Sequence, residues 1–130
     1  MIRRGFSLIE VMVVMAIIAF FAVLALPSFM SILAKAKRTE AYIHLRALHM
    51  LEKAYFAEHG TYTSALQGAN SLNWKPEGSL NYKYGTGSGD SASAQGFIIS
   101  AVADIDGDGD MDILTINETG EIKLVKDDLA

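Results

Sequence analysis

A chain of 130 residues is long enough for one domain and hardly for two. Hydrophobic residues make up 51% of it, and the excess over an ordinary soluble protein lies between Phe6 and Ala34. The net charge is -4, with basic residues mainly in the first half and acidic ones crowding the end, which argues against a nucleic-acid-binding surface. There is no cysteine, so no disulfide braces the loops.

The first segment predicts a membrane-spanning helix. Met1 to Gly5 is short and basic, and Phe6 to Leu26 contains one charged residue, Glu10. A helix from Phe6 to Leu26 is about 31 Å long, enough to cross a hydrocarbon core of about 30 Å. Arg3 and Arg4 predict that the N-terminus stays in the cytoplasm. An ordinary secretory signal would have a small-residue cleavage site after the apolar run, and this run has none.

Glu10 distinguishes this segment from a plain single-pass anchor, which is the alternative interpretation. A charged side chain at the centre of a bilayer costs about 3 kcal/mol on insertion scales, so an acid there indicates a function. No cation occurs between Phe6 and Met30 to pair with it. The partner of Glu10 is therefore expected to come from outside the segment.

The stretch from Gly5 to Val14 resembles the prepilin cleavage and methylation motif of type IV pilins and type II secretion pseudopilins. The matching features are a basic leader, Gly followed by Phe, an acid five residues into the mature chain, and an apolar run that includes Pro27. The resemblance implies that a membrane prepilin peptidase cuts after Gly5 and methylates the new amine of Phe6. It also implies that Glu10 of one subunit pairs with the Phe6 amine of a neighbour in a filament. Pairing two charges in low dielectric is favourable relative to leaving either alone.

The helical pattern is expected to continue past Pro27, although this residue removes a backbone hydrogen bond and should bend the helix. An amphipathic stripe at spacings of three and four follows, formed by Ala41, Leu45, Leu48, Leu51 and Tyr55. Gly60 is a plausible helix stop. The expected organisation is a leader at 1–5, a transmembrane and filament-core helix at 6–27, and a globular domain at 28–130, with a helix at 28–59, a loop at 60–79 and a sheet at 80–126.

The remainder predicts a small sheet. Residues 61–78 are rich in turn-forming types and indicate a connecting loop, in which Trp74 is expected to anchor in the core. Residues 85–93 predict a turn, and 117–120 predict a hairpin turn. Strand patterns occupy residues 80–84, 97–102, 113–116 and 121–125. The expected fold class is α+β, one long N-terminal helix packed on a four-stranded antiparallel sheet, which is also the fold that the resemblance to pilins implies.

Aspartates stand at every second position of one loop: Asp104, Asp106, Asp108, Asp110 and Asp112. Carboxylates this close repel one another unless they are neutralised, and Ca²⁺ prefers six to eight oxygen ligands. A loop of this spacing would offer the carboxylates of Asp104, Asp106 and Asp108 and the backbone carbonyl of Asp110. The bidentate Glu that ends an EF-hand loop is absent, because Thr115 stands at its position, so Asp112 would have to replace it. The sequence predicts a calcium site here; the alternative is a solvated acidic turn between two strands.

The resemblance implies a structural subunit of a type IV pilus, serving adhesion and surface motility. The alternative is a pseudopilin of a type II secretion system, but the Pro-Trp-Gly motif of major pseudopilins is missing. The implied partners are further copies of the chain, the prepilin peptidase, the pilus assembly platform of the inner membrane and, before assembly, the membrane itself; no nucleic acid is expected. The implied location is the inner membrane for the precursor and the cell surface for the pilus, or the periplasm for a pseudopilin.

No enzyme is predicted, and no residue is a candidate for catalysis. The sequence has no Ser-His-Asp order, phosphate-binding loop or zinc spacing. The three histidines, at positions 44, 49 and 59, do not share one helix face.

Overall fold

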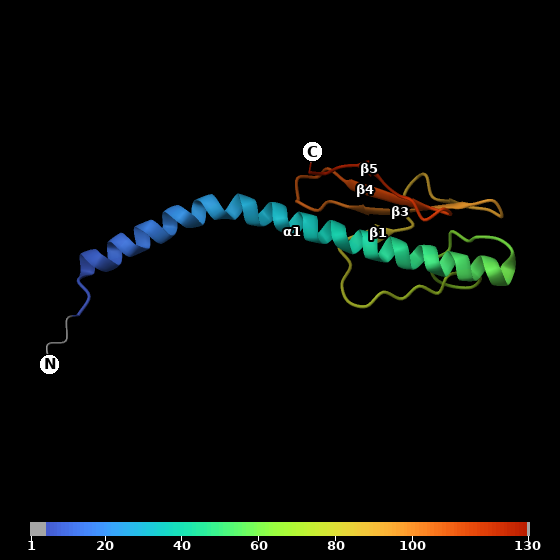
Figure 1. The fold of residues 1–130 in the computed structure, drawn as a ribbon, viewed down its shortest axis with the longest axis horizontal. Helices are drawn as coiled ribbons and strands as arrows, with labels where there is room; N and C mark the ends of the chain where they lie inside the picture. The colour runs from blue at the N-terminus through green and yellow to red at the C-terminus, as the bar shows by residue number, and fades with distance from the viewer. Residues whose placement is uncertain (1–4, 130) are drawn as a thin grey trace. The chain divides into compact units, whose positions relative to one another are not determined.

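The computed structural model describes residues 5–129. Figure 1 shows the order of the elements, one helix followed by short strands. The elements are α1 (Leu8–His59), β1 (Lys83–Tyr84), β2 (Ser91–Ala92), β3 (Phe97–Ala103), β4 (Asp112–Asn117) and β5 (Ile122–Lys126). The chain divides into two compact units, Met1–Leu33 and Ala34–Ala130.

The helix confirms the prediction from the apolar periodicity. Pro27 lies inside α1, which continues to His59, and Gly60 follows at a φ of 72°. This φ is in the left-handed region, which ends helices and which Gly adopts without a steric penalty. The helix face that enters the core of the second unit is formed by Ala34, Ala41, Leu45, Leu48 and Glu52. Leu51 and Tyr55, which the stripe also contained, are partly buried against that core.

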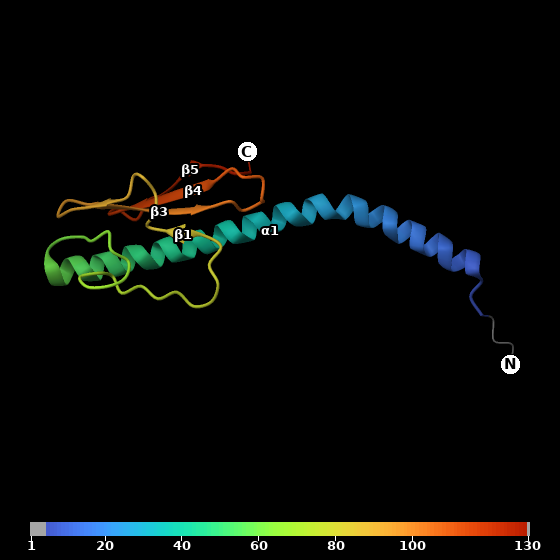
Figure 2. The same cartoon turned by 180° about the vertical axis from the view of Figure 1, so that it is seen from behind.

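The antiparallel sheet lies along the C-terminal part of α1, as both views show (Figures 1 and 2). Its strands follow the order β1-β3-β4-β5, and β2 also pairs with β3. Successive side chains of a strand point to opposite faces, so every second residue of β3 and β4 meets the helix. The inward residues are Phe97, Ile99, Ala101 and Ala103 on β3, and Asp112, Leu114 and Ile116 on β4.

Two details of the sheet differ from the sequence prediction. The strand expected at 80–84 is limited to Lys83 and Tyr84, because the backbone N–H of Asn81 donates to the Glu40 carboxylate of α1 instead of to a neighbouring strand. The turn expected at 85–93 is wrong at its end, where β2 pairs with β3 and adds a fifth, very short strand. The hairpin turn between β4 and β5 is confirmed by a hydrogen bond from the Gly120 N–H to the Asn117 carbonyl.

The segment between α1 and β1 packs against the helix. Trp74 is buried, as expected, with its ring centroid 5.6 Å from that of His44 and 5.0 Å from that of Tyr84. At the start of the segment the Thr63 N–H donates to Oε2 of Glu52 over 3.2 Å. Glu52 is fully buried and its other carboxylate oxygen has no hydrogen-bond partner.

Candidate functional site

The N-terminal end of α1 is closed by a reciprocal pair of hydrogen bonds. The backbone N–H of Glu10 donates to the Ser7 hydroxyl and the backbone N–H of Ser7 donates to the Glu10 carboxylate, each over 3.3 Å. This is a capping box, in which a Ser at the N-cap and a Glu three residues later satisfy two N–H groups that the helix leaves free. Glu10 therefore has a local role in its own helix, in addition to any contact with another chain.

The bond predicted to be cleaved lies outside the helix. The first carbonyl that accepts a helical hydrogen bond belongs to Ser7, through the N–H groups of Glu10 and Val11. Gly5 and Phe6 precede it without helical structure, and the Phe6 side chain is 85% exposed. A peptidase could thus reach the Gly5–Phe6 bond without unwinding α1. Arg3 and Arg4 of the predicted leader lie outside the described residues.

The helix of the first unit presents apolar side chains on all sides. Every large hydrophobic side chain from Leu8 to Leu33 is more than a third exposed. By length and composition this helix could cross a membrane. An apolar surface of this extent indicates a binding surface or a membrane segment, because isolated soluble proteins rarely expose so much.

The Asp-rich loop between β3 and β4 is folded around its own carboxylates. Asp104 accepts from the N–H of Gly107 over 2.6 Å and from that of Gly109 over 3.1 Å. Both glycines have positive φ, 91° and 96°, which L side chains rarely adopt and which lets the loop turn sharply. The Asp106 carboxylate accepts from the Asp108 N–H over 3.2 Å.

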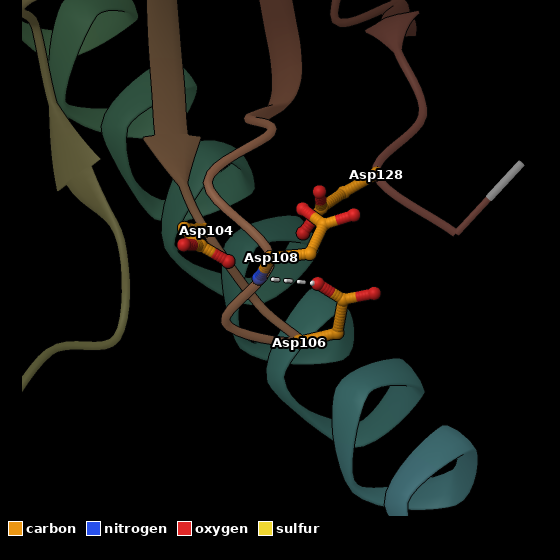
Figure 3. A group of neighbouring side chains, drawn as sticks. All are labelled: Asp104, Asp106, Asp108 and Asp128. Carbon is orange, nitrogen blue, oxygen red and sulfur yellow. Dashed lines mark hydrogen bonds between the residues drawn. The ribbon is translucent and has the colours of Figure 1, made fainter.

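Four carboxylates converge at this loop: those of Asp104, Asp106, Asp108 and Asp128. One oxygen from each lies within 4.8 Å of one oxygen from each of the others. Figure 3 shows Asp128 entering from the segment after β5 and facing Asp108. The structure thus brings together the carboxylates of three of the predicted ligand residues, and that of Asp128 lies beside them.

The side chains of Asp110 and Asp112 are engaged elsewhere. Asp110 pairs with Lys126 over 2.8 Å on the surface. Asp112 is fully buried and accepts from Arg38 over 2.6 and 3.0 Å and from the Tyr82 hydroxyl over 2.5 Å. Asp112 is buried because successive side chains of β4 alternate between the two faces of the sheet. It lies on the same face as the other inward residues of that strand, so its side chain points toward α1.

The Arg38 guanidinium connects this part of the sheet to α1. It also forms an ion pair with Asp127, whose pKa is lowered by the N–H of Leu129 and by Arg38. Burial alone would lower the pKa of Arg38, but the hydrogen bonds and charges of Asp112 and Asp127 outweigh it and raise that pKa. The bonds to Asp112 form a bidentate, charge-assisted contact, which is a strong kind of hydrogen bonding in proteins.

Comparison with known proteins finds a match to the N-terminal unit and partial matches to several relatives. Residues 1–26 match the family profile described as the prokaryotic N-terminal methylation motif. The type IV major pilin protein PilA of Myxococcus xanthus is 40% identical over 82 residues, which are 63% of this chain and 36% of that protein.

Over part of its length, the chain is thus similar to type IV pilins and to a core protein of type II secretion systems. Two further relatives are a fimbrial protein and a protein of a type II secretion system. The fimbrial protein of Neisseria meningitidis is 33% identical over 48% of this chain and 37% of its own length. The type II secretion system core protein G of Pseudomonas aeruginosa is 37% identical over 58% of this chain and 54% of its own length. The chain therefore spans between about a third and a half of these relatives.

Sequence reasoning missed two residues of these sites, Ser7 and Asp128. Ser7 had a recognisable signal, because Ser followed three residues later by Glu before an apolar run is the pattern of a capping box. Asp128 had none, since it is separated from the loop by two strands and only the fold brings it there.

Proposed function

We propose that the chain is the structural subunit of a type IV pilus, made as an inner-membrane precursor and assembled through its N-terminal helix into a surface filament. The observation that carries the proposal is a capped helix with an uncovered apolar surface and a single acid, Glu10. Such a surface needs lipid around it before assembly and the helices of neighbouring subunits afterwards. The proposed role is structural and assigns no reaction to the chain.

In this proposal prepilin peptidase cuts after Gly5 and methylates the new amine of Phe6. Cleavage creates a cation close in sequence to Glu10, and in the filament this cation pairs with Glu10 of a neighbouring subunit. A carboxylate offers about four acceptor positions, so Glu10 can keep its bond to the Ser7 N–H and also accept from an amine. The ion pair offsets the cost of placing either charge in an apolar environment.

A pilus is favoured over a secretion pseudopilin by the relatives. The major pilin of Myxococcus xanthus is 40% identical, against 37% for the core protein G of Pseudomonas aeruginosa. The pseudopilin remains the second candidate because its match extends over 54% of that relative, compared with 36% for the major pilin. Deleting the gene separates the two: loss of surface filaments with intact protein secretion supports the pilus, and intact filaments with lost secretion support the pseudopilin.

Substitutions at Glu10 test the pairing mechanism. Glu10→Gln removes the charge but keeps a side-chain oxygen for the Ser7 N–H, so the helix cap is retained. We expect this variant to be inserted and cleaved normally, with a strongly reduced yield of filaments in sheared surface material. Ser7→Ala is the matched control, because it removes the cap and keeps the charge. N-terminal mass spectrometry of the sheared fraction should find chains that begin at methylated Phe6. A normal yield from Glu10→Gln would contradict the ion pair, and intact Met1 in filaments would contradict the cleavage.

A further inference from the structure

We propose that a pocket on the outer face of the sheet, the face turned away from α1, binds a lysine side chain presented by another protein. This outer-face pocket has a volume of about 400 Å³ and lies between the loop that joins β1 to β2 and the strands β3, β4 and β5. The proposal does not depend on the filament function, since it concerns the second unit alone.

The wall of the outer-face pocket is apolar. An antiparallel sheet with one face on the core commonly carries polar side chains on the other face. Here the outward side chains that line the pocket include Ile98 and Val102 of β3, Ile113 of β4 and Val125 of β5. Ile98 and Val125 are 39% and 62% exposed. Exposed apolar surface with polar groups at its edge is typical of an interaction site.

Asp90 forms the polar end of the pocket, and its carboxylate is paired at one oxygen alone. Its Oδ2 accepts from the Ser100 hydroxyl over 3.0 Å and from the Gly87 N–H over 3.3 Å. Its Oδ1 is buried and has no hydrogen-bond partner among residues 5–129. A buried acceptor without a donor destabilises the chain, and a charged one does so more strongly. A donor that enters the pocket would remove this penalty.

The loop over the pocket is held close to the sheet at Gly87. The Gly87 N–H donates to the Ser100 hydroxyl over 2.7 Å, and a Cβ at Gly87 would lie 2.4 Å from that oxygen, so a larger residue would not fit. The Asp90 N–H closes the turn by donating to the Gly87 carbonyl over 3.1 Å. Since Oδ1 of Asp90 is buried beside Gly87, an incoming donor must displace part of this turn. Ser88 and Gly89 form no hydrogen bond within residues 5–129 that would resist the movement.

The unpaired oxygen selects lysine as the donor. The charge of Asp90 favours a cation, and no basic side chain of residues 5–129 forms a salt bridge with it. An arginine pairs best with both oxygens of a carboxylate, but Oδ2 is occupied by Ser100 and Gly87. The ammonium of a lysine is a compact charge that needs one oxygen, and its four-carbon stem packs along apolar side chains.

The exposed rim of the pocket indicates that this lysine belongs to a protein. A free amine of the size of a lysine side chain would leave Ile98 and Val125 in contact with water. On a protein surface the residues beside the lysine would cover them, and burial of this apolar area would strengthen binding. The partner is therefore a protein that presents a lysine next to apolar side chains.

The test uses the full chain in detergent, with the methyl groups of isoleucine and valine labelled for NMR. The probe is a capped valine-lysine-valine peptide, which we expect to shift the methyl signals of Ile98, Ile113 and Val125. The same peptide with acetyl-lysine should bind about tenfold more weakly, because a hydrogen bond between charged groups is lost. The peptide with arginine should also bind more weakly than the lysine peptide. A capped single lysine should bind more weakly than the tripeptide, because it leaves the rim uncovered.

Two variants locate the site. Asp90→Asn removes the charge and keeps an oxygen for Ser100 and Gly87, and it should weaken binding of the lysine peptide about tenfold. Asp110→Asn is the matched control, because it removes the same charge from an exposed residue that does not line the pocket. We expect its affinity for the peptide to equal that of the native chain.

Several results would overturn the proposal. One is the absence of methyl shifts at the highest soluble peptide concentration. Another is equal affinity of the native chain for the lysine peptide and for either the acetyl-lysine or the arginine peptide, a comparison that remains valid if Asp90→Asn does not fold. Equal losses in Asp90→Asn and Asp110→Asn would indicate a diffuse charge effect.

Two further results would replace the occupant. If the capped single lysine binds as tightly as the tripeptide, the pocket takes a free amine and the proposed protein partner is wrong. If the native chain associates with itself in analytical ultracentrifugation and Asp90→Asn does not, a second copy of the chain occupies the pocket and a different protein is excluded.

Discussion

Glu52 makes the stability of the second unit depend on pH in a predictable direction. Its carboxyl is fully buried, and burial raises its pKa from 4.5 to about 7, although the hydrogen bond from the Thr63 N–H opposes this shift. The folded chain therefore binds the Glu52 proton more tightly than the unfolded chain does. Its contribution to stability is fully present below about pH 4.5 and is lost as the pH rises through about 7.

The size of the change in the free energy of unfolding follows from the interval between the two pKa values of Glu52. Each pH unit between 4.5 and about 7 corresponds to about 1.4 kcal/mol, so the full effect is on the order of 3 kcal/mol. Glu52→Gln keeps an oxygen for the Thr63 N–H and removes the titration. We expect the variant to match the native chain near pH 4.5 and to be more stable by up to about 3 kcal/mol at pH 8.

Urea unfolding of the full chain in detergent, followed by Trp74 fluorescence from pH 4.5 to 8.5, measures this difference. Other groups titrate in the same range, so the informative quantity is the native chain minus the variant at each pH. Glu58→Gln is the matched control, because Glu58 lies on the same helix and is exposed. A difference between Glu52→Gln and the native chain that stays constant across this range would refute the reasoning.

Two further substitutions test the contacts at either end of the described chain. Ser7→Ala should destabilise the helix cap by about 1 kcal/mol and speed amide exchange at Leu8 to Glu10 about fivefold, as measured by mass spectrometry. Ser7→Thr should restore the native exchange rates. Unchanged exchange in Ser7→Ala would mean that the capping box is not formed. Arg38→Met leaves Asp112 as a buried charge without its cationic partner, so it should lower the free energy of unfolding, measured in urea, by about 3–5 kcal/mol. The exposed Arg46 is the control, and Arg46→Met should change this free energy little. Equal effects of the two variants would contradict the buried ion pair.

Local patterns were sufficient to predict the helix and the main strands. The stripe at spacings of three and four identified the buried face around Leu45 and Leu48, because an α-helix repeats every 3.6 residues. The end of α1 and the turn between β4 and β5 followed from Gly60 and Gly120, which have positive φ. β2 was missed because its two residues, in a segment rich in Gly and Ser, form a strand only through their pairing with β3.

Asp112 shows how two patterns can compete for one residue. Counted with the preceding aspartates, it is the last acid of a loop with calcium-ligand spacing. Counted with Leu114 and Ile116, it is the first inward residue of β4. The second pattern determines its side chain, because a paired strand fixes which face each residue occupies, and Arg38 and Tyr82 then satisfy the buried charge.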